Sequence, residues 1–406
     1  MSQELLRIVD NISRDKNIDR ESIFVDLEEA MVSAVRKHLG DPDANITVHI
    51  DRNTGKVTAF KDDEKIDIRQ LGRIPAQTAK QVMIQKIRAD ERDSIYGEFI
   101  QRKGEIISGT VVRYEGGTYV IDLDHRTEGF MPRHEQIAGQ SHRPGERIRC
   151  LILDVKEVGS QVKIILSRTH PDFIRRLFEQ EVPEIAEGII EIRELAREAG
   201  YRTKVAVASL DEKVDAVGAC VGVRGSRIKN IVDELGGEKI DIVRWNDSSQ
   251  VLITNALMPA KISQTALCFE LGRATVVVNE DQLSLAIGKH GQNVRLAARL
   301  TGWDIDILTP DEYNQSIEKL AECVKRVPGA DETLVDKLIA LGVISVLDLE
   351  DVGPEPLITE LNVEPALAEQ LVKVAAEQAR ELAAEQQKSQ AKDLLEQQAE
   401  TAGDQK

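Results

Sequence analysis

Two short glycine loops of the same form constrain this chain more than any other feature. One runs from Gly222 to Gly225 and the other from Gly288 to Gly291, so they lie 66 residues apart. Each follows an acidic and apolar segment with helical periodicity and precedes a second helix and a closing strand. A single loop of this kind is common by chance, whereas two in matched surroundings indicate a duplicated α/β module.

Both loops suit the binding of phosphate. Glycine has no Cβ and lets the backbone come close to a phosphate, and each loop opens a helix whose N–H groups attract anions. The simpler alternative is a pair of turns that merely need glycine. The candidate binding residues are Gly222, Val223, Arg224, Gly225, Ser226, Arg227 and Lys229 in the first loop and Gly288, Lys289, His290, Gly291, Gln292, Asn293 and Arg295 in the second.

The distribution of charge decides whether a nucleic acid is a plausible ligand. The formal net charge of −17 argues against one when the chain is taken whole. Residues 309–406, however, hold 9 basic and 21 acidic side chains and carry −12 of this charge. The rest is nearly neutral and can bear a local basic track, while the acidic end is either a solvated helical region or an arm that binds a partner or mimics RNA.

Ahead of the loops, the hydrophobic pattern predicts two further domains. Residues 1–103 read as a small α+β unit, with helices over 3–13, 20–39 and 77–100 and a β-hairpin between the second and third. Residues 104–170 contain five short strands separated by turns, which predicts an OB-type barrel. The barrel's candidate base-stacking residues are Tyr114, Tyr119, Phe130 and His134.

The remaining boundaries follow the duplicated modules, which we place at residues 171–245 and 246–310. In the first module we expect a helix over 183–199 and a strand over 203–208. Residues 311–380 predict an acidic helical repeat of helix-hairpin-helix type, and 381–406 a low-complexity, disordered tail. The predicted fold class is therefore multi-domain α+β.

The sequence offers no pattern typical of catalysis, metal binding or membrane insertion. None of the seven histidines stands in an HExxH or HxH pair, and Gly55-Lys56 is followed by valine, so it is no P-loop. The four cysteines are far apart without a CxxC pair, which argues against a zinc cluster and fits a reducing cytosol. No run approaches about 18 apolar residues. We therefore expect no enzyme, cofactor, metal or membrane span.

The motifs resemble known RNA-binding modules. The Gly-Val-Arg-Gly and Gly-Lys-His-Gly loops are similar to those of tandem type II KH domains, whose loop clamps about four nucleotides. Residues 104–168, with Gly109-Thr110-Val111 and Glu128-Gly129-Phe130, resemble the RNA-binding barrel named for a small-subunit ribosomal protein. The order of a small α+β domain, one barrel, two KH domains and an acidic end resembles the NusA family of bacterial transcription termination and antitermination factors.

This resemblance implies a non-enzymatic elongation factor in the cytoplasm, acting as a monomer. The N-terminal domain would bind RNA polymerase near the RNA exit channel, and the barrel and KH domains would bind nascent single-stranded RNA. Holding that RNA would alter hairpin formation and so shift pausing, termination and antitermination, together with other antitermination factors. Family members often carry two acidic repeats that touch the polymerase α subunit or mask RNA binding. This chain has one, near 317–378, and its role stays open.

Two other functions share the RNA-binding surface. One is a ribosome-associated RNA-binding or translation factor, and the other is an accessory subunit of an RNA-processing enzyme. Co-purification with RNA polymerase or with ribosomes would discriminate the first from a transcription factor.

Overall fold

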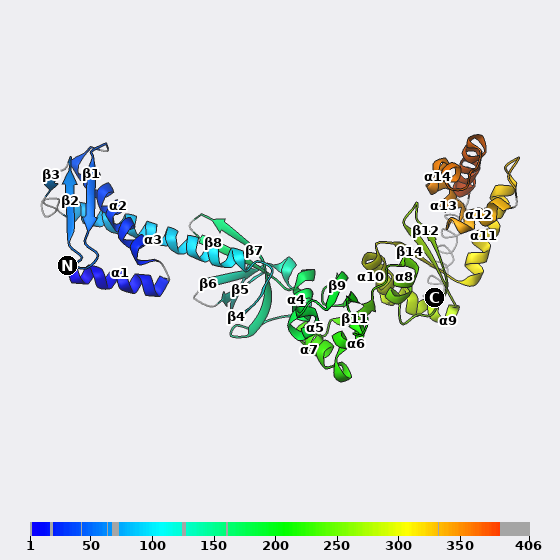
Figure 1. The fold of residues 1–406 in the computed structure, drawn as a ribbon, viewed down its shortest axis with the longest axis horizontal. Coiled ribbons are helices and arrows are strands. Elements are labelled where there is room, and N and C mark those ends of the chain that lie inside the picture. Colours follow the sequence, from blue (N-terminus) through cyan, green and yellow to red (C-terminus); the bar gives the residue numbers. More distant parts are fainter. Residues whose placement is uncertain are drawn as a thin grey trace, which may run out of the picture. The chain divides into compact units, whose positions relative to one another are not determined.

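The computed structural model describes residues 2–16, 19–41, 43–62, 64–66, 73–123, 127–159, 161–331 and 333–381. It divides into two units, residues 1–177 and 178–406, and each is described by itself (Figure 1). The predicted disordered tail lies outside the described residues, apart from Glu381, the last described residue of a helix that begins at Pro365.

The start of the first unit is a small α+β region. Asp19 caps its second helix by accepting backbone hydrogen bonds from Glu21 and Ser22, and Gly40 ends that helix in the left-handed conformation, as the sequence predicts. A third short strand extends the predicted hairpin into a sheet. The elements are α1 (Ser2–Lys16), α2 (Arg20–Leu39), β1 (Ile46–Ile50), β2 (Val57–Lys61), β3 (Glu64–Ile66) and α3 (Arg73–Gln101).

The predicted barrel is present as a closed sheet in the order β4-β5-β6-β8-β7. Strands β6 and β8 pair in parallel, and β7 closes the barrel by pairing with β4 in antiparallel fashion. This strand order, 1-2-3-5-4 and back to 1, is that of a five-stranded OB-type Greek-key barrel. The strands are β4 (Ile106–Glu115), β5 (Thr118–Leu123), β6 (Thr127–Met131), β7 (Arg147–Val158) and β8 (Gln161–Ser167).

The second unit contains the duplicated modules. Each has a three-stranded sheet whose middle strand pairs antiparallel with one neighbour and parallel with the other. Helix α4 (Pro171–Glu181) crosses the boundary between the two units. The first module comprises α5 (Pro183–Ala186), β9 (Ile190–Glu198), β10 (Arg202–Ser209), α6 (Ala216–Val221), α7 (Ser226–Glu234) and β11 (Lys239–Arg244). The second comprises α8 (Ser249–Ala256), β12 (Ile262–Cys268), β13 (Arg273–Val278), α9 (Glu280–Ile287), α10 (Gln292–Thr301) and β14 (Asp304–Leu308).

The helix predicted over 183–199 is wrong for most of its length. Helix α5 stops at Ala186, Gly188 takes a positive φ of 72°, and strand β9 begins at Ile190. The register between β9 and β10 shifts at Ala206/Val207, where Arg193 is the unpaired extra residue. This bulge breaks the alternation of apolar residues along β9, so the segment has no clear period of two in the sequence.

The two modules form one body. Ala196, Ala206 and Val243 of the first module share a single hydrophobic cluster with the helices and sheet of the second. Helix α10 contacts β9 and β10, and helix α8 contacts β11. The sheet face of the first module that α6 and α7 leave open is therefore covered by helices of the second module.

The C-terminal helices cover the second module in a similar way. Val277, from its sheet, clusters with Tyr313 of α11 and with Ile344, and Cys268 packs into the core of the helical repeat. Arg273 binds Asp348 and Asp351 of that repeat, at 2.5 and 3.3 Å. These elements are α11 (Pro310–Lys325), α12 (Thr333–Ala340), α13 (Val346–Val352) and α14 (Pro354–Thr359).

Candidate nucleic-acid interface

The two glycine loops have nearly the same backbone conformation. The first glycine has φ and ψ of 74° and 176° in one loop and 74° and 173° in the other. The third residue of each loop, Arg224 or His290, has a φ of 53°, which is uncommon for a residue other than glycine. Two unrelated turns would not agree in this way, so the loops are copies of one structural device.

The glycines serve different purposes within each loop. A Cβ on Gly222 would lie 2.8 Å from Cγ of Arg227, and one on Gly288 would lie 2.7 Å from Cβ of Asn293. A Cβ on Gly291 would meet nothing within 4 Å. The first glycine is thus required by packing inside the protein, and the last keeps the outer side of the loop open for a close approach.

The cations that remain free mark the outer surface of the loops. Val223, at the tip of the first loop, is 82% exposed. Arg224, Lys229, Lys289 and His290 are also exposed, and no ion pair engages the three Arg and Lys side chains among the described residues. Helices α7 and α10 start directly after the loops, so their first N–H groups lie beside these cations. The arrangement can hold phosphates of a strand that passes over the loop.

Two predicted phosphate contacts are instead bound to carboxylates of the protein. Arg227 donates through Nη1 to Glu184 Oε2 at 2.9 Å and to the Ala219 carbonyl at 2.7 Å. Arg295 donates through Nε to Glu198 Oε1 at 2.6 Å. The hydrogen bond from Arg295 lowers the pKa of Glu198, which favours the charged pair. In this structure both arginines brace their loops, and their direct contact with RNA stays a prediction.

Asn293 also differs from its prediction. It is 1% exposed, and its Nδ2 lies 3.1 to 3.2 Å from the carbonyl oxygens of Leu257, Leu285 and Ala286. The side chain therefore ties the start of α10 to the end of α9 beneath Gly288. Gln292 is half-buried and donates to Glu198 Oε2 at 2.9 Å.

Sequence reasoning missed Glu184 and Glu198 because neither lies near a loop in the chain. Glu198 ends β9 in the first module, yet it holds Gln292 and Arg295 of the second. Two carboxylates among many in an acidic chain give no local signal, and only the packing of α10 on β9 brings Glu198 to the second loop.

One of the barrel's candidate stacking residues is buried. Tyr119 is buried in the barrel core, and its hydroxyl accepts a hydrogen bond from the His142 backbone at 3.1 Å. Its ring packs against that of the exposed Tyr114, with 4.6 Å between ring centroids. His134 is exposed on a short 3-10 turn beyond β6. Tyr114 and His134 thus remain accessible to a ligand.

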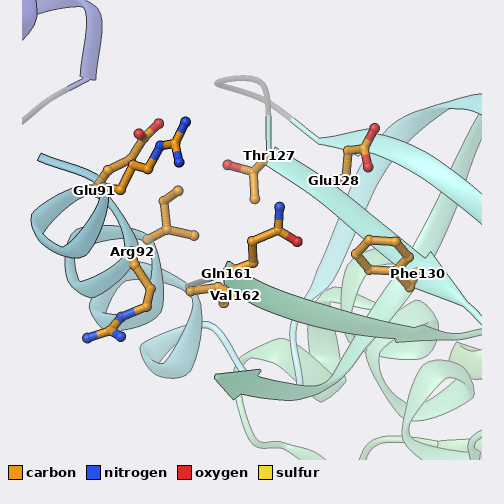
Figure 2. Close-up of a pocket in the computed structure, with 9 residues that line it drawn as sticks. Glu91, Arg92, Thr127, Glu128, Phe130, Gln161 and Val162 are labelled. Carbon is orange, nitrogen blue, oxygen red and sulfur yellow. The ribbon is translucent and has the colours of Figure 1, made fainter. Parts of the chain in front are cut away.

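Phe130 is half-buried beside a pocket of about 480 Å³ between helix α3 and strands β6 and β8 (Figure 2). The Lys163 ammonium lies 6.0 Å from the centre of its ring. Glu91 and Arg92 of α3 and Glu128 of β6 also line the pocket, so cations and anions are mixed there. This surface is electrostatically less suited to a polyanion than the two glycine loops, Gly222–Gly225 and Gly288–Gly291, which we call the clamp loops.

Comparison with known proteins places this architecture. Family models match residues 4–66 as a NusA N-terminal domain, 168–245 as a NusA-like first KH domain and 249–315 as a NusA-like second KH domain. A Bacillus subtilis protein named "Transcription termination/antitermination protein NusA" is 40% identical over 339 residues, which cover 76% of this chain and 91% of the relative. The chain belongs to the NusA family.

Two further NusA-family relatives bear the same name. The Mycobacterium tuberculosis (strain H37Rv) protein is 42% identical over 73% of this chain and 90% of its own length. The Rickettsia prowazekii protein is 33% identical over 91% of this chain and 80% of its own length. The family assignment and the strand order agree on the predicted fold class, an α+β chain with two tandem type II KH domains.

Membrane-spanning helices and metal-binding clusters are both absent from the residues that the structure describes. No described helix is long and apolar enough to cross a membrane. No group of three or more His, Cys, Asp or Glu side chains in the same residues is arranged to hold a metal ion.

Proposed function

We propose that this chain is a non-enzymatic transcription elongation factor that binds RNA polymerase and nascent single-stranded RNA. By holding RNA as it emerges, it modulates pausing, termination and antitermination. The name of its relatives, transcription termination/antitermination protein, supports this role over a translation factor or a subunit of an RNA-processing enzyme. The observation that carries the proposal is the pair of clamp loops with matching backbone angles and unpaired, exposed cations.

RNA binding rests on phosphate contacts at the two loops. Arg224 and Lys229 serve the first loop, and Lys289 and His290 serve the second, while Arg227 and Arg295 keep the loops in shape. Because both modules share one hydrophobic core, the loops stand at a fixed separation. A fixed separation lowers the entropy lost when one strand engages both loops. The barrel contributes Tyr114, Phe130 and His134 as secondary contacts.

The N-terminal region anchors the chain to the polymerase near the RNA exit channel in this account. Its match to the NusA N-terminal domain supports an interaction with polymerase in general. Arg14 and Lys37 are exposed on α1 and α2 and are candidate contacts. We further propose that the chain acts as a monomer in the cytoplasm, alongside other antitermination factors.

The test is transcription in vitro through a hairpin-dependent pause, with purified polymerase and the full chain. The variant Arg224→Glu/Lys289→Glu should shorten the pause relative to the unchanged chain while still co-purifying with polymerase. The control Lys319→Glu/Lys337→Glu alters charge equally at two exposed lysines of the C-terminal helices and should behave like the unchanged chain. A loop variant that pauses polymerase as well as the control would contradict the proposal.

A further inference from the structure

The turn between β9 and β10 presents an aromatic side chain beyond the contacts assigned above. Tyr201 is 64% exposed at the tip of this hairpin. A single exposed ring is ordinary at a protein surface, so what distinguishes Tyr201 is its position.

Hydrogen bonds connect this turn of the first module to the clamp loop of the second. The Tyr201 N–H donates to the Glu198 carbonyl at 3.0 Å, which places the two Cα atoms within about 7 Å of each other. The Glu198 carboxylate accepts from Gln292 and Arg295 at 2.9 and 2.6 Å. Arg295 also donates to the His290 carbonyl at 3.3 Å. One carboxylate therefore lies between the Tyr201 turn and the second clamp loop.

The backbone that carries Tyr201 is held firmly. Gly200 donates its N–H to the buried carboxylate of Glu238 at 2.8 Å, and Arg197 donates to the same carboxylate at 2.9 Å. The Tyr201 carbonyl accepts from Lys239 at 3.1 Å. A ring on a fixed turn loses little conformational freedom when a flat ligand stacks on it.

We propose that Tyr201 is a base-stacking platform for the RNA strand held by the second clamp loop. The cations of the clamp loops would contact phosphates, and an aromatic ring beside them can accept any base by its π-face. The strand would then place one base on Tyr201 where it passes from the first module to the second. This proposal rests on the RNA binding proposed above and adds a contact that carries no charge.

Phe269 provides a matched control. It is 71% exposed at the corresponding hairpin of the second module, between β12 and β13. Its ring meets Trp303 edge-on, with 5.1 Å between centroids, and the adjacent Cys268 packs among the C-terminal helices. Among the described residues, no hydrogen bond or ring contact ties Phe269 to either clamp loop.

The experiment measures binding of the full chain to a single-stranded RNA that carries 2-aminopurine at one position, varied along the strand. We expect Tyr201→Leu to weaken binding about tenfold, with an unchanged salt dependence because no charge is lost. Tyr201→Phe should bind like the unchanged chain, since the ring remains, and Phe269→Leu should do the same. At one RNA position, stacking on the ring should quench 2-aminopurine fluorescence in the unchanged chain and not in Tyr201→Leu.

Three results would overturn the inference. Tyr201→Leu could bind as tightly as the unchanged chain, or Tyr201→Phe could lose as much affinity as Tyr201→Leu, which would implicate the hydroxyl. Phe269→Leu could lose as much as Tyr201→Leu, which would indicate a general effect of exposed rings. Tryptophan fluorescence checks that each variant is folded, because both tryptophans lie in the KH modules. If the unchanged chain fails to bind RNA, the proposed function itself is refuted.

Discussion

Residues of the clamp loops divide into a supporting set and an exposed set. Gly222 and Gly288, with Arg227 and Asn293 packed beneath them, form the supporting set. The exposed set consists of Arg224 and Lys229 in the first loop and Lys289 and His290 in the second. Mutations in the first set should therefore alter folding, and mutations in the second should alter binding.

The glycines test this division directly. Ala at Gly222 or Gly288 must adopt a backbone region almost restricted to glycine and meet the packed side chain below, so we expect a loss of about 3 kcal/mol or more in unfolding free energy. Ala at Gly225 or Gly291 meets open space or ordinary contact and should cost about 1–2 kcal/mol. Urea unfolding followed by tryptophan fluorescence measures both, and equal losses would contradict the division.

Glu198 should make the KH modules sensitive to acid. Its pKa is lowered in the folded state by the hydrogen bond from Arg295, so its stabilising contribution is present above the ordinary value of 4.5 and is lost as pH falls through the folded pKa. Glu198→Gln should be less stable at pH 7 and lose less stability between pH 7 and acid. Glu191→Gln, in the same strand and paired with the exposed Arg193, is the control, and an identical acid response in both variants would refute the role of Glu198.

At the scale of single residues, the sequence predicts the positions of the two loops better than it predicts which side chains are exposed. The spacing of Gly222 and Gly225 and its repetition are local features, so they are visible in the sequence. The burial of Asn293 and the fully buried Lys204, whose Nζ binds Asp241 at 3.0 Å, depend on contacts between segments distant in the chain. Residue type alone suggests solvent exposure for both.

At the scale of secondary-structure elements, the hairpin between α12 and α13 packs against strand β12 of the second KH module. A Cβ on Gly342 would lie 2.2 Å from the Leu267 carbonyl oxygen of β12. The backbone N–H groups of Gly342 and Val343 are bound within the hairpin, and that of Ile344 is bound by Asp348. These N–H groups are already bound within the protein, so they are not available to a phosphate of duplex DNA. The acidic charge of the region also disfavours such binding.

Gly342→Ala should detach the helical repeat from the second KH module. All four cysteines are buried, and burial raises the pKa of the Cys268 thiol beneath the repeat. We expect Gly342→Ala to speed the reaction of protein thiols with a disulfide reagent about tenfold or more, because a buried thiol reacts through open states. Gly329→Ala is the control, with a similar φ of 93° and nothing within 4 Å. Equal rates in the two variants would contradict the docked arrangement.

Elements with a clean hydrophobic period are predicted well from the sequence, and interrupted ones are not. The five strands predicted within residues 104–170 are present, and so are the predicted helices before and after each clamp loop. Strand β9 does not, because the bulge at Arg193 removes its alternation and leaves a pattern compatible with a helix. Its partner β10, with an unbroken run from Val205 to Val207, is correctly predicted.

The whole molecule combines an anchoring region with an RNA-holding unit in the proposed function. Deleting residues 1–103 should abolish co-purification with RNA polymerase while leaving RNA binding by the KH modules in place, because those modules have their own core. A pull-down assay with purified RNA polymerase measures the first effect, and an RNA-binding assay measures the second. Retained polymerase binding in the deletion variant would place the anchor elsewhere in the chain.

The central claim is that the two clamp loops hold the phosphates of single-stranded RNA. The most direct test is the affinity of the full chain for RNA as a function of salt, in the unchanged chain, in Arg224→Glu/Lys289→Glu and in the charge-matched Lys319→Glu/Lys337→Glu. The account predicts that the loop variant alone loses affinity, and that its slope in log affinity against log salt becomes shallower by about 0.7 for each lost phosphate contact. A loop variant that is folded and keeps both the affinity and the slope of the unchanged chain would contradict the account.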